Sequence, residues 1–310
     1  MLIDGVWQEK WQPVQKQDEK GRFLRQSSSF RERITPEQVQ TTDASESRFT
    51  LYVAYICPWA TRTLIARNLL GLEKYFDVKS VEPVLTDYGW KLDSDNAGSW
   101  TYMHELYSQS DEHYTGRATV PVIWDNQEQR IINNESADIL EIFNNDLHRL
   151  KQHDVDLHPV VLTDEIFDFN NRIYNSLNNG VYRAGFATTQ DAYQEAYTDV
   201  FSTLDWLEEH FSDKKYAVGE QLTESDIRLF VTLVRFDLAY YGLFKTNKKR
   251  ISDYVNLSVY LDRLMAIPAF SQNTRVDHIK QGYYSIKQLN PNGIVPEGPE
   301  LPWFKYLGEK

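Results

Sequence analysis

The chain has 310 residues, of which 41% are hydrophobic and 25% charged, so it is long enough to bury a sizeable core. Its 33 Lys and Arg against 45 Asp and Glu give a net charge of −12, which disfavours nucleic acid as a partner because a phosphate backbone repels an acidic surface. No apolar stretch reaches the roughly 20 residues of a membrane span, and the first twenty residues have no apolar signal-peptide core. We therefore expect a cytoplasmic protein that does not enter a membrane.

The expected N-terminal domain follows an arm. Residues 1–48 alternate charged and polar residues with scattered aromatic ones, so we expect few regular elements there. The segments that follow alternate between β-branched or aromatic runs, typical of strands, and an apolar-periodic run, typical of a helix. In chain order, the predicted elements are a strand over 49–55, a helix over 59–70 that Gly71 ends, and a strand over 78–84.

The second half of this domain begins with a polar stretch, residues 86–117, which we expect to be a long insertion. A hairpin formed by 119–125 and 129–133 is predicted next, and a helix over 135–147 follows it. The order βαβ, insertion, ββα is that of a thioredoxin-like domain, which we place at residues 49–150.

The hydrophobic period changes after residue 150. Apolar residues recur at helical spacing in three segments: 166–177, 197–211 and 227–238. The segment from Thr223 to Asp226 has the form of a capping box before a buried helix. We expect an all-helical domain over 151–288, and a tail rich in Pro and Gly over 289–310 that is not a helix. The predicted fold class is therefore α/β plus all-α.

Cys57 is the only cysteine, which excludes an intramolecular disulfide and any multi-cysteine metal site. It lies at the predicted junction of the first strand and first helix, where free backbone N–H groups and the positive helix end stabilise a thiolate. Ala60 occupies the position that the second cysteine of a CxxC pair would take. An outside thiol must therefore resolve any mixed disulfide formed on Cys57.

Two further motifs predict a pocket for a peptide. A cis Val120–Pro121 bond would present the Val120 backbone to an extended ligand by strand-like pairing, with an edge-strand proline of no consequence as the alternative. Ser136 and the free N–H groups of the helix start can hold a carboxylate, and Glu135 an ammonium, with an ordinary cap as the alternative. Together with Cys57 these motifs describe a pocket for a zwitterionic peptide that carries a thiol, and glutathione fits.

A family resemblance runs from about residue 20 to about residue 299. The segments that carry it are CPWA (57–60), DYGW (87–90), GRATVP (116–121), NES (134–136), NGVYRAGFATTQ (179–190), LTESDIRLF (222–230), TLVRFD (232–237), and HIK with YY (278–284). Together they resemble the glutathionyl-hydroquinone reductases, the Xi-class branch of the glutathione transferase superfamily.

The resemblance implies a homodimer that reduces glutathionyl-hydroquinones with glutathione as co-substrate, without a further cofactor or a metal. Cys57 matches the nucleophile, Tyr182 the proton donor and acceptor, and Tyr240 and Tyr283 the two tyrosines that favour the thiolate. The positions that match glutathione contacts are Trp90, Arg117, Ala118, Thr119, Val120, Pro121, Glu135 and Ser136. The segment Leu243-Phe244-Lys245-Thr246 departs from the usual family sequence, which bears on substrate preference.

The implied reaction also follows from the chemistry of one thiol. When the thiolate attacks the sulfur of a glutathionyl group on an aromatic ring, the leaving carbon needs a proton, and Tyr182 can supply it. A second glutathione then attacks the Cys57 mixed disulfide and releases glutathione disulfide.

Two alternatives remain. A general glutathione-dependent thiol transferase or dehydroascorbate reductase of omega-like type would share the cysteine but would not need Tyr182 as an acid. A non-catalytic binding protein would keep only the fold, which the retained cysteine and tyrosines disfavour. His148, His153 and His158 lie in a charged linker, where we expect solvated side chains and no metal site.

Overall fold

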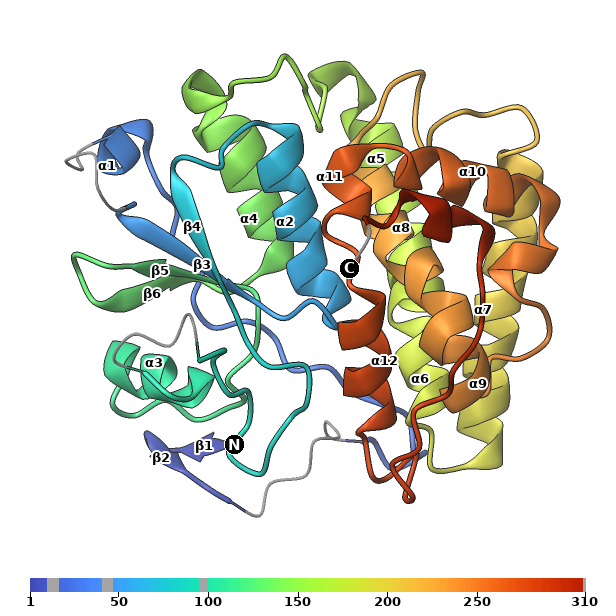
Figure 1. Cartoon of the computed structure of the whole chain (residues 1–310), viewed down its shortest axis with the longest axis horizontal. Helices are drawn as coiled ribbons and strands as arrows, with labels where there is room; N and C mark the ends of the chain where they lie inside the picture. Colours follow the sequence, from blue (N-terminus) through green and yellow to red (C-terminus); the bar gives the residue numbers. More distant parts are fainter. Residues whose placement is uncertain (10–16, 41–46, 95–99, 309–310) are drawn as a thin grey trace. The chain divides into compact units, whose positions relative to one another are not determined.

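The computed structural model describes residues 1–9, 17–40, 47–94 and 100–308, shown in Figure 1. Parts of the predicted arm, insertion and tail lie outside the described residues. The chain divides into two compact units. Gln26–Val155 form the first with the described residues of Met1–Pro13, and Asp156–Lys310 form the second with those of Val14–Arg25.

A four-stranded mixed sheet in the order β4-β3-β5-β6 is the centre of the first unit. Its strands are β3 (Phe49–Val53), β4 (Phe76–Ser80), β5 (Val122–Asp125) and β6 (Arg130–Asn133). β3 pairs parallel with β4 and antiparallel with β5, so that Leu51 lies opposite both Val78 and Ile123. β5 and β6 form the predicted antiparallel hairpin. This is the thioredoxin-like arrangement.

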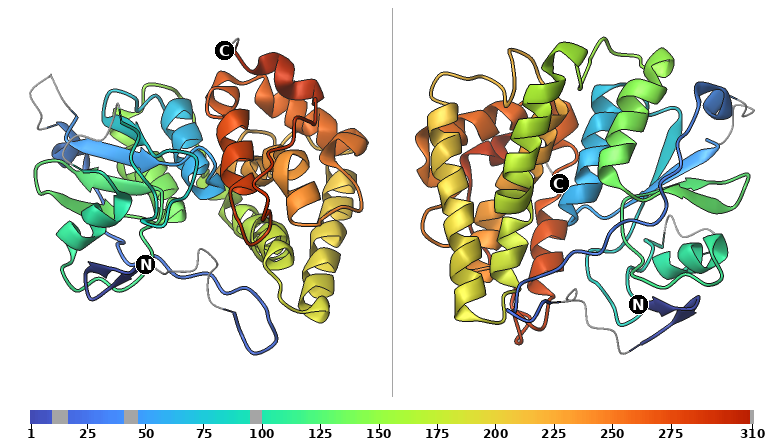
Figure 2. Two further views of the ribbon diagram at one scale, coloured as in Figure 1. Left: turned by 60° about the horizontal axis from the view of Figure 1, so that its bottom comes forward. Right: turned by 180° about the vertical axis from the view of Figure 1, so that it is seen from behind.

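Helices cover both faces of this sheet (Figure 2). α2 (Pro58–Leu69) and α4 (Ser136–Glu141) pack side by side on one face, and α3 (Met103–Ser110) packs against β6 on the other. All five residues of β3 are buried as a result, which explains why β-branched, aliphatic and aromatic residues follow one another there without a charged one. The smaller elements of the unit are β1 (Leu2–Ile3), β2 (Val6–Trp7), α1 (Pro36–Gln40), the π-helix η1 (Ile142–Asp146) and the 3-10 turn η2 (His148–Leu150).

Helix α3 corrects the expectation that residues 86–117 are only an insertion. It buries Met103, Leu106 and Tyr107, at helical spacing, within a mostly polar sequence. The Glu105 carboxylate accepts hydrogen bonds from the backbone N–H groups of Thr101 (2.7 Å) and Tyr102 (3.1 Å), which satisfies free donors at the helix start. The sequence did not predict this helix, because only three apolar residues mark its two turns and the rest of the segment is polar.

Two other predicted elements have different limits. The predicted strand over 78–84 is observed as Phe76–Ser80. Val81 still donates its N–H to the Val53 carbonyl of β3 (2.9 Å) and also forms a bridge with Leu92, and Pro83, which has no N–H to donate, follows two residues later. The predicted helix over 135–147 begins as α4 and continues as the π-helix η1.

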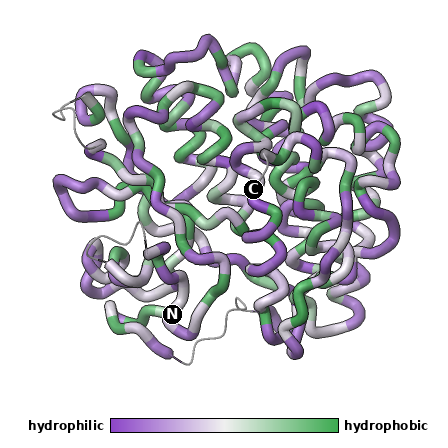
Figure 3. The backbone as a smooth tube through the Cα atoms, viewed as in Figure 1, coloured by the Kyte–Doolittle hydropathy of each residue, from purple (hydrophilic) through white to green (hydrophobic). Residues whose placement is uncertain are grey.

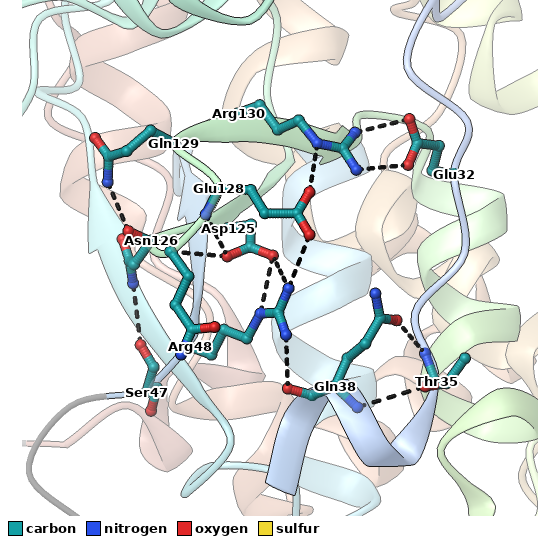
Figure 4. A network of polar contacts seen from close by, with 11 residues as sticks. Glu32, Thr35, Gln38, Ser47, Arg48, Asp125, Asn126, Glu128, Gln129 and Arg130 are labelled. Carbon is teal, nitrogen blue, oxygen red and sulfur yellow. Dashed lines mark hydrogen bonds and ion pairs between the residues drawn. The ribbon is translucent and has the colours of Figure 1, made fainter. Parts of the chain in front are cut away.

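A network of ion pairs joins the β5–β6 turn to the preceding arm (Figure 4). Arg48 donates to the Asp125 carboxylate through Nε (2.9 Å) and Nη2 (2.7 Å), and Nη2 also reaches Glu128 at 3.0 Å. Asp125 is fully buried. Arg130 forms a forked pair with Glu32 at 2.7 and 2.9 Å near the surface. Removing one partner of the buried pair would leave a buried charge unpaired and is therefore more costly than removing a partner of the exposed pair, which contributes little.

The second unit is helical, as predicted. Its elements in chain order are η3 (Val160–Leu162), α5 (Thr163–Ile173), η4 (Tyr174–Asn178), α6 (Gly180–Gly185), α7 (Gln190–His210), α8 (Glu224–Arg235), η5 (Phe236–Tyr240), α9 (Tyr241–Leu243), η6 (Ile251–Asp253), α10 (Val255–Met265), α11 (Pro268–Ser271), α12 (Val276–Tyr284) and η7 (Pro302–Tyr306). η4 and η5 are π-helices, and the other η elements are 3-10 turns. Figure 3 shows hydrophobic and hydrophilic stretches alternating along these helices. α8 is the buried helix at the centre of the unit.

The capping box at the start of α8 is confirmed. Asp226 accepts hydrogen bonds from the Thr223 backbone (2.8 Å) and from the Tyr260 hydroxyl (2.8 Å). The tail is not an α-helix within the described residues, as expected, but it is ordered by the 3-10 turn η7 and by Trp303, which is fully buried.

Candidate active site

Cys57 caps the start of α2 with an extended backbone (φ −76°, ψ 117°), and Pro58 takes the first helical position, where a missing N–H costs nothing. The Cys57 N–H donates to the Ala54 carbonyl (2.9 Å), and its carbonyl accepts from the Thr61 N–H (3.0 Å). Its side chain is partly exposed, and Sγ lies 3.6 Å from the Val120 carbonyl oxygen, within hydrogen-bond distance for a thiol. The backbone of Cys57 is therefore fixed while its sulfur stays accessible.

The loop 117–121 precedes β5, and its Val120–Pro121 peptide bond is cis, as predicted. The Tyr107 hydroxyl holds this loop: it donates to the Thr119 carbonyl (2.9 Å) and accepts from the Thr119 N–H (3.2 Å). It also accepts from Nδ2 of Asn134 at 3.0 Å. Burial raises the pKa of Tyr107, so this phenol stays protonated as a donor. Sequence reasoning missed this residue because it lies in the unpredicted helix α3.

The Glu135–Ser136 pair lies at the start of α4. Glu135 is the N-cap, and its carboxylate accepts from the Ala137 N–H (3.2 Å) and from the Ser28 hydroxyl (2.9 Å). Ser136 is the first helical residue and is buried. The arm residue Ser28 thus orients a carboxylate for which we predicted an ammonium partner, and no sequence signal indicated this contact.

The remaining predicted glutathione contacts lie in two segments. Trp90 is partly buried between β4 and α3, where its carbonyl accepts from the Met103 N–H at 2.9 Å. The backbone of Arg117 is held on both sides, because its N–H donates to Gln26 (3.1 Å) and its carbonyl accepts from the Tyr114 hydroxyl (3.1 Å). A contact between Sγ and the carbonyl oxygen joins Cys57 to Val120, whereas the grouping of Trp90 and Arg117 with them stays a prediction.

Three tyrosine hydroxyls meet in the second unit. Tyr182 is in α6, Tyr240 ends the π-helix η5, and Tyr283 is in α12. The Tyr283 oxygen lies 2.6 Å from that of Tyr182 and 2.8 Å from that of Tyr240, whereas Tyr182 and Tyr240 are 3.5 Å apart. Tyr283 is therefore the central member of a connected set of hydroxyls that spans three elements.

The three tyrosines differ in how deeply they are buried. Tyr240 and Tyr283 are buried, and loss of solvent raises the pKa of each well above that of a free phenol, although the nearby positive charge of Arg235 opposes the shift. Both therefore remain protonated near neutral pH. Tyr182, in contrast, is partly exposed.

Phe244 packs against all three tyrosines. It stacks on Tyr240 (centroids 5.1 Å apart) and meets the rings of Tyr182 (5.4 Å) and Tyr283 (5.6 Å) edge to face. Gly185 permits this approach, because a Cβ there would lie 2.4 Å from the Phe244 ring. Phe244, from the segment 243–246, thus helps to fix the positions of the three tyrosine rings.

The three linker histidines differ from one another. His148 and His153 are exposed, as expected. Nδ1 of His148 lies 2.8 Å from the Asn145 carbonyl oxygen, and Nδ1 of His153 lies 3.1 Å from that of Leu69. His158 departs from the expectation, because only 26% of its side chain is exposed and Nδ1 lies 3.7 Å from the buried Glu224 carboxylate. Among the described residues, no three His, Cys, Asp or Glu side chains are grouped so as to hold a metal ion.

Comparisons with known proteins agree with this fold. The family model of the glutathione S-transferase N-terminal domain matches residues 56–146, and that of the C-terminal domain matches residues 190–263. The glutathionyl-hydroquinone reductase PcpF of Sphingobium chlorophenolicum is 42% identical to the chain over 309 residues, which cover 97% of each protein.

Two solved structures are similar throughout. The glutathione-S-transferase Xi from Phanerochaete chrysosporium superposes with a TM-score of 0.86 at 41% identity, covering 93% of this chain and 96% of that one. The glutathione-bound structure of YqjG, a glutathione transferase homolog from Escherichia coli K-12, gives a TM-score of 0.86 at 39% identity, covering 98% and 97%. The chain therefore belongs to the glutathione S-transferase family, in the Xi class together with the glutathionyl-hydroquinone reductases.

Proposed function

We propose that this protein reduces glutathionyl-hydroquinones to hydroquinones with glutathione. The observation that carries the proposal is a single accessible cysteine at a helix start, together with three linked tyrosine hydroxyls, in a chain 42% identical to such a reductase. Neither feature is required by the fold alone.

The first step is attack of the Cys57 thiolate on the sulfur of the glutathionyl group. A sulfur–sulfur bond forms, and the bond between sulfur and the ring carbon breaks with its electron pair left on the carbon. That carbon then takes a proton, which gives the hydroquinone. A carbon leaving group is strongly basic, so proton donation by a positioned acid accelerates this step.

Tyr182 is the proposed acid, because it is the exposed member of the tyrosine set. When it gives up its proton, the Tyr283 hydroxyl at 2.6 Å can donate a hydrogen bond to the phenolate, and Tyr240 can donate to Tyr283 in turn. In this proposal Tyr240 and Tyr283 act on Tyr182, whereas in the sequence-based hypothesis they act on the Cys57 sulfur.

The second step regenerates the enzyme. A glutathione thiolate attacks the mixed disulfide, a new sulfur–sulfur bond forms in glutathione disulfide, and Cys57 leaves as the thiolate. We propose that residues 117–121, Trp90, Glu135 and Ser136 bind the glutathionyl group that becomes linked to Cys57. The glutathione-bound structure of the similar protein YqjG supports glutathione as the ligand.

Location and assembly belong to the same proposal. The described part of the chain contains no helix that is both long and apolar enough to cross a membrane. We propose a cytoplasmic homodimer, with a glutathione-binding domain over 49–150 and a helical substrate domain over 151–288, and with glutathione as the only co-substrate.

Steady-state turnover tests this function. The protein, supplied with a glutathionyl-hydroquinone and glutathione, should form hydroquinone and glutathione disulfide in equal amounts, and Cys57→Ser should form neither. If the wild-type protein turns over only simple mixed disulfides of glutathione, it is a general thiol transferase and the proposal is wrong.

A further inference from the structure

The arm segment Gln17–Arg25 belongs to the helical unit rather than to the domain that it precedes in the sequence. It forms a small turn in which the Asp18 N–H donates to the Arg22 carbonyl (3.0 Å) and the Asp18 side chain pairs with Arg22 Nε (2.7 Å). Gly21, with φ +78°, allows this turn, because a side chain is strained in that backbone conformation. The segment is therefore a preformed element and not a loose connection.

Contacts with the connection between α6 and α7 fix where this segment lies. The Gly21 carbonyl accepts a hydrogen bond from the Thr188 N–H (3.2 Å). The Lys20 carbonyl accepts one from Thr189 Oγ1 (2.9 Å). Gln17 Nε2 donates to the Phe186 carbonyl at 3.0 Å. The segment is thus anchored just beyond the C-terminal end of α6, the helix that carries Tyr182.

Two side chains of the segment reach Tyr182 itself. The Phe23 ring stacks on the rings of Tyr182 (centroids 6.2 Å apart) and Phe186 (5.9 Å). The Arg25 guanidinium carbon lies 5.1 Å from the centre of the Tyr182 ring, and Arg25 Nε donates to the Asn179 side chain at 2.7 Å. Asn179 is buried immediately before α6, so it holds the guanidinium in place.

We propose that Arg25 is a positioning residue for proton donation: held by Asn179, its guanidinium orients the Tyr182 phenol and stabilises the phenolate that remains after the proton has left. The proposal rests on the proposed function, in which Tyr182 is the acid. A cation over an aromatic ring is attracted to it, and the attraction grows when the ring carries a negative charge. The rings of Phe23, Phe186 and Phe244 and the hydroxyls of Tyr240 and Tyr283 also meet Tyr182, and all of these groups are neutral. Arg235 lies near Tyr240 and Tyr283, whereas Arg25 places its positive charge over the Tyr182 ring itself.

The test compares two substrates. Arg25→Met keeps the length of the stem and removes the charge, and it should lower kcat on a glutathionyl-hydroquinone by roughly 3- to 30-fold, the range of a cation–π contact. A mixed disulfide of glutathione with a simple thiol has a leaving group that departs without a proton, so its kcat and KM should stay within about twofold. Arg25→Lys should recover part of the lost rate, because the charge returns without the planar fork.

Arg22→Met is the matched control. Arg22 lies in the same turn, is partly exposed and pairs with Asp18 and Glu195, so its loss should leave both rates unchanged. A double-mutant cycle completes the design: in the Tyr182→Phe background, Arg25→Met should change the rate by less than about twofold, because Arg25 acts through Tyr182.

Three outcomes would overturn the proposal. Equal losses on both substrates would make Arg25 a general structural or glutathione-binding residue. No loss on either, with Tyr182→Phe still impaired, would reject the role of Arg25 while the proposed function survives. No reduction of the conjugate by the wild-type protein would reject the proposed function, and this proposal with it.

Discussion

The hydroxyl oxygens of Tyr182 and Tyr283 lie 2.6 Å apart, although the two residues are separated by 101 positions in the chain. Tyr283 also lies 2.8 Å from Tyr240, so it links a partly exposed phenol to a fully buried one. This relationship lets Tyr283 and Tyr240 stabilise the phenolate that Tyr182, the proposed acid, becomes when it gives up its proton.

Tyr283→Phe should therefore slow hydroquinone formation even though Tyr182 remains. Loss of the donor that stabilises the Tyr182 phenolate should lower kcat on a glutathionyl-hydroquinone by about tenfold, the effect of roughly 1.4 kcal/mol. Steady-state kinetics measure this effect. Tyr284→Phe, which changes the neighbouring tyrosine outside the set, is the control and should behave as wild type; an equal effect of the two changes would contradict the shared role of the hydroxyls.

Tyr182→Phe separates the proposed reductase from a general thiol transferase. It should lower the rate on a glutathionyl-hydroquinone by about 10²-fold or more, because the leaving carbon loses its acid, with little change in glutathione affinity. The rate on a simple glutathione mixed disulfide should be unchanged. Equal losses on both substrates would mean that Tyr182 acts on Cys57 itself, and no loss on either would mean that Tyr182 is structural.

Glu135→Ala and Ser136→Ala should each weaken glutathione binding by about tenfold, since each removes a partner for a charged end of the peptide. Ser28→Ala should have a smaller effect, because the Ser28 hydroxyl only orients the Glu135 carboxylate. Calorimetric titration checks all three. Glu141→Ala, a change at an exposed acid of the same helix, is the control; unchanged affinity in both the Glu135 and Ser136 variants would place glutathione elsewhere.

Asp125→Ala should destabilise the first unit by about 3 kcal/mol, because it leaves the largely buried Arg48 guanidinium without its main partner. Glu32→Gln, which weakens the more exposed pair with Arg130, should cost less than about 1 kcal/mol. The midpoint of urea unfolding, followed by circular dichroism, compares the two. Similar midpoints for the two variants would show that burial does not decide the contribution of these pairs.

Much of the fold could be predicted because its signals are local. The strand Phe49–Val53 is a β-branched and aromatic run that is buried on both faces, and the β5–β6 hairpin and the α8 capping box each have a short sequence signature. Helix α3 could not be predicted, because its three buried side chains are spread through polar residues.

The candidate site was less predictable. The place of Cys57 before α2 follows from the strand, Pro and helix order, but nothing periodic relates Tyr182 to Tyr240 and Tyr283, which lie 58 and 101 residues away. Only the family resemblance indicated these tyrosines. The contacts from the arm, Ser28 on Glu135 and Arg25 over Tyr182, depend on long-range folding of a segment with no regular pattern.

The most direct test of the proposed function is a single turnover on Cys57. The reduced protein is mixed with a glutathionyl-hydroquinone in the absence of free glutathione, and the products are followed by mass spectrometry. The proposed mechanism predicts one glutathione adduct on Cys57 for each hydroquinone released, and none in Cys57→Ser, which stays folded but lacks a thiolate. Hydroquinone released without an adduct on Cys57, or in the Cys57→Ser variant, would contradict it.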